Sequence, residues 1–147
     1  EIGDMPLDMQ SKLLRVLQEG EVRPVGSNKT RKVDVRVVGA TNKDLEAMCA
    51  EGTFRQDLFY RLNVVAIELP ALREREGDVP HLVRFILRSV SAELGRPVEV
   101  TPAALEALGR WGWPGNVREL ENELRRSAVL AAGAIDLADL SPAIAGH

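Results

Sequence analysis

Residues 54–70 read FRQDLFYRLNVVAIELP, and this stretch decides how the first half of the chain is expected to fold. Its first nine residues are typical of a short helix and include two arginines, Arg55 and Arg61. The run Val64–Leu69 is apolar and rich in β-branched residues, which predicts a strand that ends at Pro70. Strands that alternate with helices are the pattern of α/β proteins with a mostly parallel sheet.

The same alternation continues upstream. Apolar residues at helical spacing predict a helix over residues 6–19. The turn-forming GSN at residues 26–28 predicts a β-hairpin, and Pro24 marks its first arm as an edge strand. Residues 34–40 are expected to form a strand buried on both faces, followed by a short helix that Asp44 caps.

The composition changes after Pro70. Residues 71–78 are charged and lack a strand pattern, so we expect a linker. Residues 79–147 have helical patterns throughout and predict a small bundle. The expected helix caps are Asp78, Thr101 and Asn116, the last with Glu119 at the spacing of a capping box. We therefore predict an α/β part over residues 1–70 and a helical part over 79–147.

Composition also excludes several classes of function. The net charge of -3 provides no basic field for nonspecific nucleic-acid binding. No apolar run reaches membrane-spanning length, and the single cysteine, Cys49, excludes an internal disulfide. His81 and His147 have no spacing that suggests a metal site, and the chain contains no GxxxxGK[ST] phosphate loop. We expect a cytoplasmic protein without a membrane partner.

Thr41 and Asn42 follow the strand predicted over residues 34–40. In open α/β sheets, ligands bind just outside the carboxyl ends of the strands, so these polar groups could sense a phosphate or an attacking water. Alternatively, Asn42 turns the chain and caps the next helix. The pattern leaves both interpretations open.

Arg118 is predicted at the second position of a helix, where the helix dipole disfavours a cation by about 0.3 to 1 kcal/mol. The free N–H groups at that end bind anions, and an added arginine would complete a phosphate clamp. The alternative is an ion pair with Glu121, three residues later.

Arg55 and Arg61 are six residues apart, which on one helix separates them by roughly 240°. They therefore cannot share one patch, so either each has its own partner or each reaches toward a different object. Asp57 is one turn before Arg61 and could pair with it, whereas Arg55 has no acid three or four residues later. A guanidinium that reaches a neighbouring subunit's phosphate site is an arginine finger; the alternative is a structural role.

Several segments together carry a family resemblance, among them EIGDMP (1–6), VDVRVVGATNKDL (33–45), GTFRQDLFYRLNV (52–64) and WPGNVREL (113–120). In this order they resemble the AAA+ ATPase domain of bacterial sigma-54-dependent transcription activators, the NtrC-like enhancer-binding proteins. The resemblance implies an α/β P-loop AAA+ core, partial here because it lacks the Walker A strand, followed by an all-α helical lid subdomain. Without that strand, residues 35–40 and 64–69 are expected to have open edges unless they pair directly.

The resemblance also implies a function for the intact protein. Such proteins form a hexameric or heptameric ring that hydrolyses ATP with Mg²⁺ and remodels sigma-54 RNA polymerase to open promoter DNA. Binding to DNA would require a separate domain after residue 147. Residues 1–147 alone are expected neither to bind ATP tightly nor to hydrolyse it. The alternatives are another AAA+ ATPase, of the chelatase or clamp-loader type, and a non-enzymatic helical interaction module.

The resemblance assigns roles to individual residues, and none of them is a metal ligand. Glu1 is similar to the acidic residue that ends Walker B and orients or activates water. Thr41 and Asn42 are similar to the sensor I residues. Arg55 and Arg61 are similar to the two arginine fingers, and Arg118 is similar to the sensor II arginine.

Overall fold

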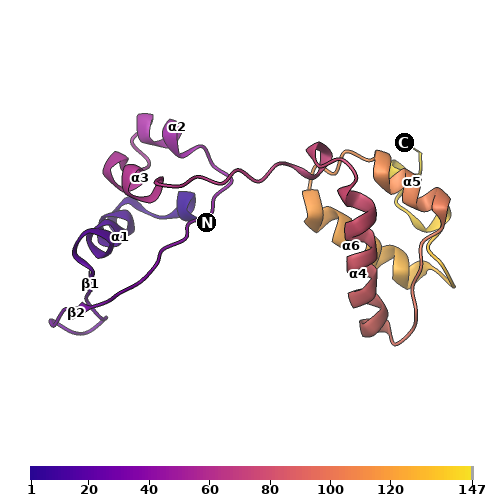
Figure 1. Cartoon of the computed structure of the whole chain (residues 1–147), viewed down its shortest axis with the longest axis horizontal. Helices are drawn as coiled ribbons and strands as arrows, with labels where there is room; N and C mark the ends of the chain where they lie inside the picture. The colour runs from indigo at the N-terminus through magenta and orange to yellow at the C-terminus, as the bar shows by residue number, and fades with distance from the viewer. Residues whose placement is uncertain (147) are drawn as a thin grey trace. The chain divides into compact units, whose positions relative to one another are not determined.

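The computed structural model describes residues 1–146 and divides them into two compact units (Figure 1). The first unit is Glu1–Ile67, and the second begins at Glu68. His147, which is predicted in the helical part and has no spacing that suggests a metal site, lies outside the described residues.

The first unit consists of short helices and one hairpin. Its elements are η1 (Ile2–Asp4), α1 (Leu7–Glu19), β1 (Glu21–Val22), β2 (Arg31–Lys32), α2 (Leu45–Ala50) and α3 (Gln56–Leu62). The predicted first helix is confirmed, and it ends where Gly20 adopts a left-handed conformation with φ of 66°. The Asp44 cap is also confirmed, because its Oδ1 accepts a 3.0 Å hydrogen bond from the Ala47 N–H.

The hairpin prediction is confirmed as well. Strands β1 and β2 are antiparallel, with Glu21 opposite Lys32 and Val22 opposite Arg31. The Val33 N–H donates to the Gly20 carbonyl over 2.7 Å and fixes the base of the hairpin.

A small apolar core holds the first unit together. Leu14 of α1, Leu58 of α3 and Phe54 between α2 and α3 are buried. Partly buried side chains surround them: Ile2, Leu13, Leu17, Leu45, Met48, Cys49, Phe59 and Leu62. This core joins the three helices and does not include the segments predicted as strands.

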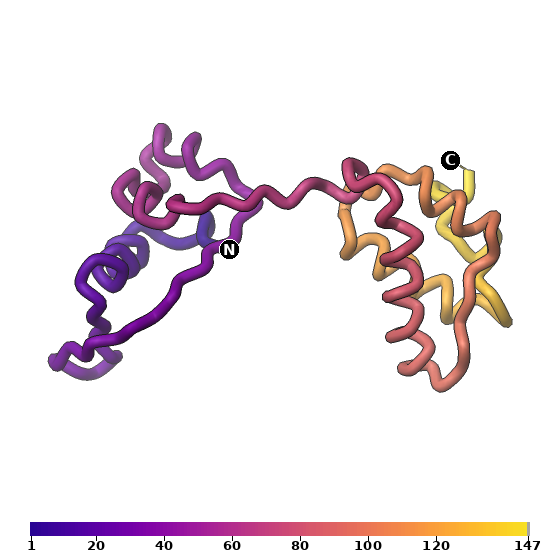
Figure 2. The backbone as a smooth tube through the Cα atoms, viewed as in Figure 1, coloured from indigo at the N-terminus to yellow at the C-terminus, as the bar shows by residue number. Residues whose placement is uncertain are grey.

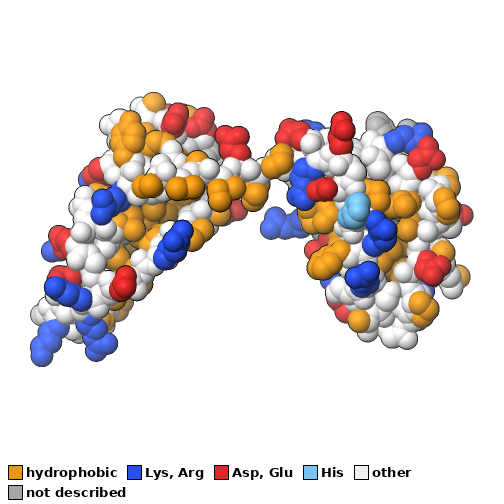
Figure 3. All heavy atoms as spheres, viewed as in Figure 1, with side chains coloured by type: hydrophobic (Ala, Val, Ile, Leu, Met, Phe, Trp, Pro, Cys, Tyr) orange, Lys and Arg blue, Asp and Glu red, His pale blue; other side chains and the backbone are white. Residues whose placement is uncertain are grey.

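The two predicted strands, residues 34–40 and 64–69, are not strands in this structure. Figure 2 shows both as extended backbone, and among residues 1–146 the only sheet is the hairpin. Val38 is 85% exposed and Ile67 is 80% exposed, so the prediction of a doubly buried strand was wrong. A strand forms only where a neighbouring strand accepts and donates its backbone hydrogen bonds, and these segments do not pair with each other. Figure 3 shows a row of exposed apolar side chains along the segment of residues 64–69.

The second unit is helical, as predicted. Its elements are η2 (Leu72–Glu74), α4 (Asp78–Leu94), α5 (Pro102–Arg110), α6 (Asn116–Leu130), η3 (Leu137–Asp139) and α7 (Pro142–Ala145). Helices α4 and α6 lie side by side (Figure 1). The Thr101 cap of α5 is confirmed, since its hydroxyl accepts from the Ala104 N–H at 3.3 Å. Gly95, with φ of 65°, ends α4.

The core of the second unit is larger and draws on every helix from α4 to α7. Val83, Leu108, Leu120 and Leu124 have no exposed surface. Trp113 is also fully buried, and its indole N–H donates to the Leu108 carbonyl over 2.9 Å. Buried aromatic N–H groups are usually paired in this way.

Residues 71–78, expected to be a linker, belong largely to the second unit. Leu72 is 2% exposed within its core. The Leu72 N–H donates to Asn116 Oδ1 over 2.8 Å, so the Asn116 side chain does not cap its own helix, contrary to prediction. Instead Gly115 is the cap residue of α6, and its N–H donates to Glu119 Oε2 over 2.7 Å. Likewise, the cap of α4 is Gly77, one residue before the predicted Asp78.

No helix in residues 1–146 combines the length and the apolar character that crossing a membrane requires.

Candidate functional site

The first residues of the chain lie against the segment that follows residues 34–39. The Ile2 N–H donates to the Ala40 carbonyl over 3.0 Å. A side chain at Gly3 would place its Cβ 2.7 Å from Thr41 Oγ1, so the Gly3 backbone packs closely against the Thr41 side chain. The structure therefore brings Glu1 and Thr41, two of the predicted site residues, to the same region of the first unit.

An ion pair closes this contact. The Lys43 ammonium binds the Asp4 carboxylate and also lies 3.4 Å from the Gly3 carbonyl. The hydrogen bond from Lys43 is the main cause that lowers the pKa of Asp4. The Thr41 hydroxyl accepts from the Lys43 N–H at 3.1 Å. These contacts hold the segment bearing Glu1 beside the predicted sensor.

Asn42 is exposed, and its side chain forms no hydrogen bond with the described residues. The next helix is capped by Asp44, so the interpretation of Asn42 as a helix cap was wrong. Its amide is available to a ligand, as the sensor interpretation requires.

Arg55 is the residue that precedes α3, and its backbone is extended with φ of -77° and ψ of 129°. Its guanidinium makes two hydrogen bonds to Asp57, at 3.0 Å and 2.7 Å, and a third to Ser11 Oγ at 3.2 Å. The hydrogen bonds from the Arg55 guanidinium are the main cause that lowers the pKa of Asp57. Helical spacing rules do not apply before the first turn, which explains why the sequence suggested Arg61 as the partner of Asp57 and none for Arg55.

Arg61 lies in the last turn of α3 and donates to the Leu17 carbonyl over 3.1 Å. Leu17 is in the last turn of α1, where carbonyl groups lack helical partners and a cation is favourable. The two arginines have separate partners, which is one of the two arrangements that the sequence left open. Both nevertheless contact α1, because Arg55 also reaches Ser11 near its start and Arg61 reaches Leu17 near its end.

Arg118 is exposed in the first turn of α6 and forms no hydrogen bond or ion pair with the described residues. The alternative pair with Glu121 is not formed, since Glu121 binds Arg125 at 3.0 Å. Arg118 is thus an unneutralised cation near a helix N-terminus, which suits an anionic ligand.

Sequence reasoning missed Gln10. This residue of α1 is completely buried, and its amide nitrogen donates to the carbonyls of Met5 and Thr53 at 2.8 Å and 3.1 Å. Its Oε1 accepts from the Arg55 N–H at 2.8 Å. The signal was a polar residue on the apolar stripe of α1, three after Leu7 and four before Leu14.

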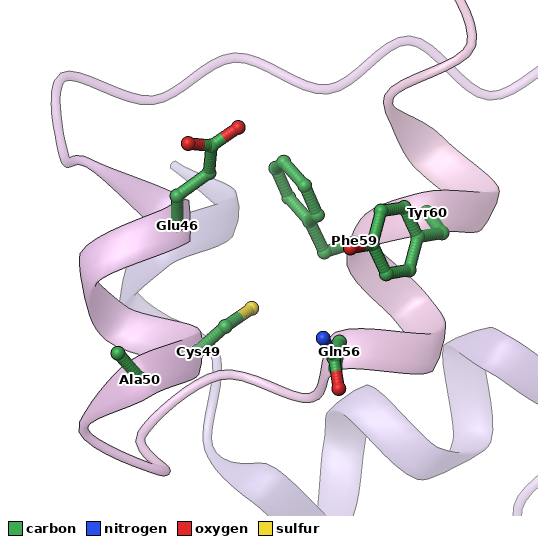
Figure 4. A pocket seen from close by; sticks show the side chains of 6 residues that line it. All are labelled: Glu46, Cys49, Ala50, Gln56, Phe59 and Tyr60. Carbon is green, nitrogen blue, oxygen red and sulfur yellow. The ribbon is translucent and has the colours of Figure 1, made fainter.

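An open groove of about 460 Å³ lies between α2 and α3 (Figure 4). The residues that line it are Glu46, Cys49, Ala50, Gln56, Phe59 and Tyr60. The Cys49 sulfur points into the groove, and burial raises the pKa of this thiol. None of the predicted site residues lines it.

Within residues 1–146 no group of three or more His, Cys, Asp or Glu side chains could hold a metal ion. This structure therefore does not assign a Mg²⁺ ligand set to the chain.

Two family models match the chain. Residues 1–68 match the sigma-54 interaction domain, and residues 73–147 match the AAA+ ATPase lid domain. The chain belongs to the sigma-54-dependent activators. The fold is accordingly part of an AAA+ core followed by its lid, as the sequence predicted.

Curated relatives of this sigma-54 activator are transcriptional regulators. The Nif-specific regulatory protein of Sinorhizobium fredii (strain NBRC 101917 / NGR234) is 59% identical over 134 residues, covering 91% of this chain and 23% of the relative. The transcriptional regulator NtrC of Azospirillum brasilense is 53% identical over 152 residues, covering 97% and 31%. The chain thus spans less than a third of the length of either relative.

Solved structures agree with this family. NtrX from Brucella abortus in complex with ADP has a TM-score of 0.89 and 39% identity, with coverage of 99% of this chain and 34% of that chain. NtrX in complex with ATP has a TM-score of 0.87 and 40% identity, with coverage of 98% and 35%. NtrX, which contains this fold, is thus a relative that was crystallised with ADP and with ATP.

Proposed function

We propose that this chain forms the sensor, arginine-finger and lid part of a ring that hydrolyses ATP and remodels sigma-54 RNA polymerase to open promoter DNA. Family membership supports this function, and the NtrX structures with ADP and ATP support ATP as the substrate. The ring is hexameric or heptameric and cytoplasmic, and DNA is bound by a separate domain.

The observation that carries the proposal is the contact between Glu1–Asp4 and the segment from Ala40 to Lys43. This contact, made by Ile2 and Gly3, supports a joint role for the neighbouring Glu1 with Thr41 and Asn42. In the proposed mechanism Glu1 orients or activates the attacking water, while Thr41 and Asn42 sense the terminal phosphate. Phosphoryl transfer depends mainly on positioning and electrostatic stabilisation, which these groups provide.

Arg55 and Arg61 are the proposed fingers that reach the nucleotide of a neighbouring subunit. The Arg55 side chain is 41% exposed despite its pair with Asp57, so one side of the guanidinium is accessible to phosphate. Arg61 donates to the Leu17 carbonyl, which is neutral, so this contact does not neutralise the positive charge of Arg61. Arg118, which has no partner among the described residues, is the proposed lid contact to the nucleotide phosphates.

The chain contains no GxxxxGK[ST] motif. In the proposal, the phosphate loop and the Mg²⁺ ligands are therefore supplied outside these 147 residues. We expect these residues alone to show no ATP turnover and no tight ATP binding.

The test is ATP turnover by the full-length protein with single substitutions. We expect Arg55→Ala and Arg61→Ala to reduce kcat on the order of a thousandfold, because each removes a charge that stabilises the transition state. Arg118→Ala and Glu1→Gln should also reduce turnover. Arg110→Ala is the matched control, since Arg110 is exposed and only pairs with Glu106 in its own helix. Unchanged turnover in all three arginine variants of the site would contradict the proposal.

Mixed rings test whether the arginines act across subunits. Arg55→Ala subunits have an intact Glu1, and Glu1→Gln subunits have an intact Arg55. Mixing the two should restore part of the turnover, because some interfaces then combine both intact groups. Promoter opening by sigma-54 RNA polymerase, measured on the same mixtures, should recover in parallel.

A further inference from the structure

Gln10 is a buried polar side chain in a helix whose other inward-facing residues are apolar. The amide nitrogen donates to two backbone carbonyls, and the amide oxygen accepts from one backbone N–H. All three hydrogen bonds therefore fix the main chain rather than another side chain. A buried amide is costly unless such bonds are made. The arrangement therefore holds a defined backbone geometry at the atoms it binds.

Two of these atoms bracket the residue before Arg55. The Thr53 carbonyl accepts a 3.1 Å hydrogen bond from Gln10 Nε2, and the Arg55 N–H donates a 2.8 Å hydrogen bond to Gln10 Oε1. Arg55 lies outside α3, so no helical hydrogen bond fixes its N–H. Gln10 is therefore the group that fixes the backbone from which the Arg55 side chain projects.

The next residue of α1 acts on the other end of the same side chain. Ser11 Oγ accepts from Arg55 Nη1 at 3.2 Å, while its own hydroxyl donates to the Leu7 carbonyl at 3.1 Å. The first turns of α1 thus hold Arg55 at its backbone through Gln10 and at its guanidinium through Ser11.

The third bond extends this contact toward the other predicted site. Gln10 Nε2 donates to the Met5 carbonyl at 2.8 Å, and Met5 follows the η1 turn that begins beside Glu1. One amide therefore connects the segment bearing Glu1, which would act on the subunit's own nucleotide, with Arg55, which would act on a neighbour's.

We infer that Gln10, assisted by Ser11, is a positioning residue that sets the location of the Arg55 finger for ATP hydrolysis at the neighbouring subunit. This inference rests on the proposed function. Gln10 itself touches no nucleotide; its effect passes through Arg55. A displacement of about 1 Å in a positioned group can reduce a rate by roughly a hundredfold, so loss of the Gln10 and Ser11 contacts with Arg55 should lower kcat measurably.

The test uses full-length protein with Gln10→Met, which keeps the length of the side chain and removes the amide. We expect kcat to fall about tenfold to a hundredfold, while the KM for ATP stays within about twofold. The reason is that Arg55 acts on ATP bound by the neighbouring subunit, and other groups of that subunit bind the ATP. Gln18→Leu is the matched control, since Gln18 is an exposed glutamine of α1, and it should retain wild-type kcat.

Mixed rings separate positioning from general structural damage. Gln10→Met subunits mixed with Glu1→Gln subunits should recover turnover, as Arg55→Ala subunits do. The Glu1→Gln subunits contribute a correctly held Arg55, and in the Gln10→Met subunits the Ile2–Ala40 and Lys43–Asp4 contacts still hold the segment bearing Glu1. Failure to recover, in mixtures where Arg55→Ala does recover, would overturn the inference. Ser11→Ala is the second variant, needed if Gln10→Met does not assemble. Ser11 is exposed, so its loss should leave the fold intact and lower kcat several-fold.

The outcomes distinguish the two proposals. If Arg55→Ala retains full turnover, the proposed function fails. If Arg55→Ala is impaired while assembled Gln10→Met and Ser11→Ala rings both turn over ATP normally, only the inference about α1 fails.

Discussion

The two units contrast in how they bury apolar surface. In the second unit, all helices from α4 to α7 contribute to one core. In the first, the buried core is formed by Leu14, Phe54 and Leu58, while Val38, Val64 and Ile67 are at least 78% exposed. Helices satisfy their own backbone hydrogen bonds, whereas strands depend on neighbours. A helical lid can therefore be complete within a segment of chain, and part of a parallel sheet cannot.

The largest expected difference between the units is in amide hydrogen exchange. Core amides of α4 and α6 should exchange on the order of a thousandfold or more slowly than those of residues 34–39, which are outside any sheet. Exchange followed by NMR or mass spectrometry on this chain measures the difference. Comparable protection of residues 34–39 would show that they are paired in solution, and the contrast would then be lost.

A core substitution tests the second unit directly. Leu124→Ala should lower the free energy of unfolding by about 2 to 5 kcal/mol, because it leaves a cavity at a fully buried position. Both tryptophans of the chain, Trp111 and Trp113, lie in this unit, so their fluorescence during urea denaturation reports its unfolding. Val129→Ala on the same helix is the control: Val129 is 69% exposed, and a change within about 0.5 kcal/mol is expected.

Glu123 makes the second unit sensitive to acid. Burial raises the pKa of this carboxyl, but hydrogen bonds from Arg126 and Ser141 outweigh burial and lower the pKa below its ordinary value of 4.5. The ionised form is therefore favoured by folding, and its contribution is present above about pH 4.5 and is lost as the pH falls through the lower folded pKa.

We therefore expect Glu123→Gln to destabilise the second unit by about 1 to 3 kcal/mol at neutral pH. The difference from wild type should shrink as the pH is lowered below 4.5. Tryptophan fluorescence during urea denaturation at several pH values measures both effects. Glu106→Gln is the control, because Glu106 forms only an exposed pair with Arg110. A difference that grows at low pH would contradict the assignment.

The smallest expected effect is in the first unit. Arg61→Ala removes a cation from the C-terminal end of α1, which is worth about 0.3 to 1 kcal/mol. The amides in the last turn of α1 should then exchange about two- to fivefold faster, as hydrogen-exchange NMR can measure. Lys12→Ala, in the same helix but away from that end, should leave these rates unchanged.

What the sequence predicted correctly was local. Gly20, Asp44 and Thr101 end or begin helices as expected, because each acts on backbone groups within a few residues. Apart from the cap of α4, which is Gly77 and not Asp78, the errors concern distant partners. Residues 34–40 have the composition of a strand, but a strand forms only with a neighbour. Gln10 binds backbone atoms 43 and 45 residues away, and no local pattern indicates those contacts.

The candidate site shows the same division. The residue types at Thr41, Arg55 and Arg118 could be recognised from spacing and from resemblance. Their partners could not: Asp57 binds Arg55 because α3 begins at Gln56, two residues later than a helix over 54–62 would suggest. The helix start sets which side chains meet, and a shift of one or two residues changes the pairing.

The hydrogen bond between the Leu72 N–H and Asn116 Oδ1 has a mechanical consequence. Asn116 is two residues before Arg118, at the first residue of α6. Tension applied to the chain just before Leu72 would act on the first turn of α6 through this bond and on the core through the buried Leu72 side chain. Because Arg118 lies in that first turn, a displacement of the turn would move its guanidinium as well.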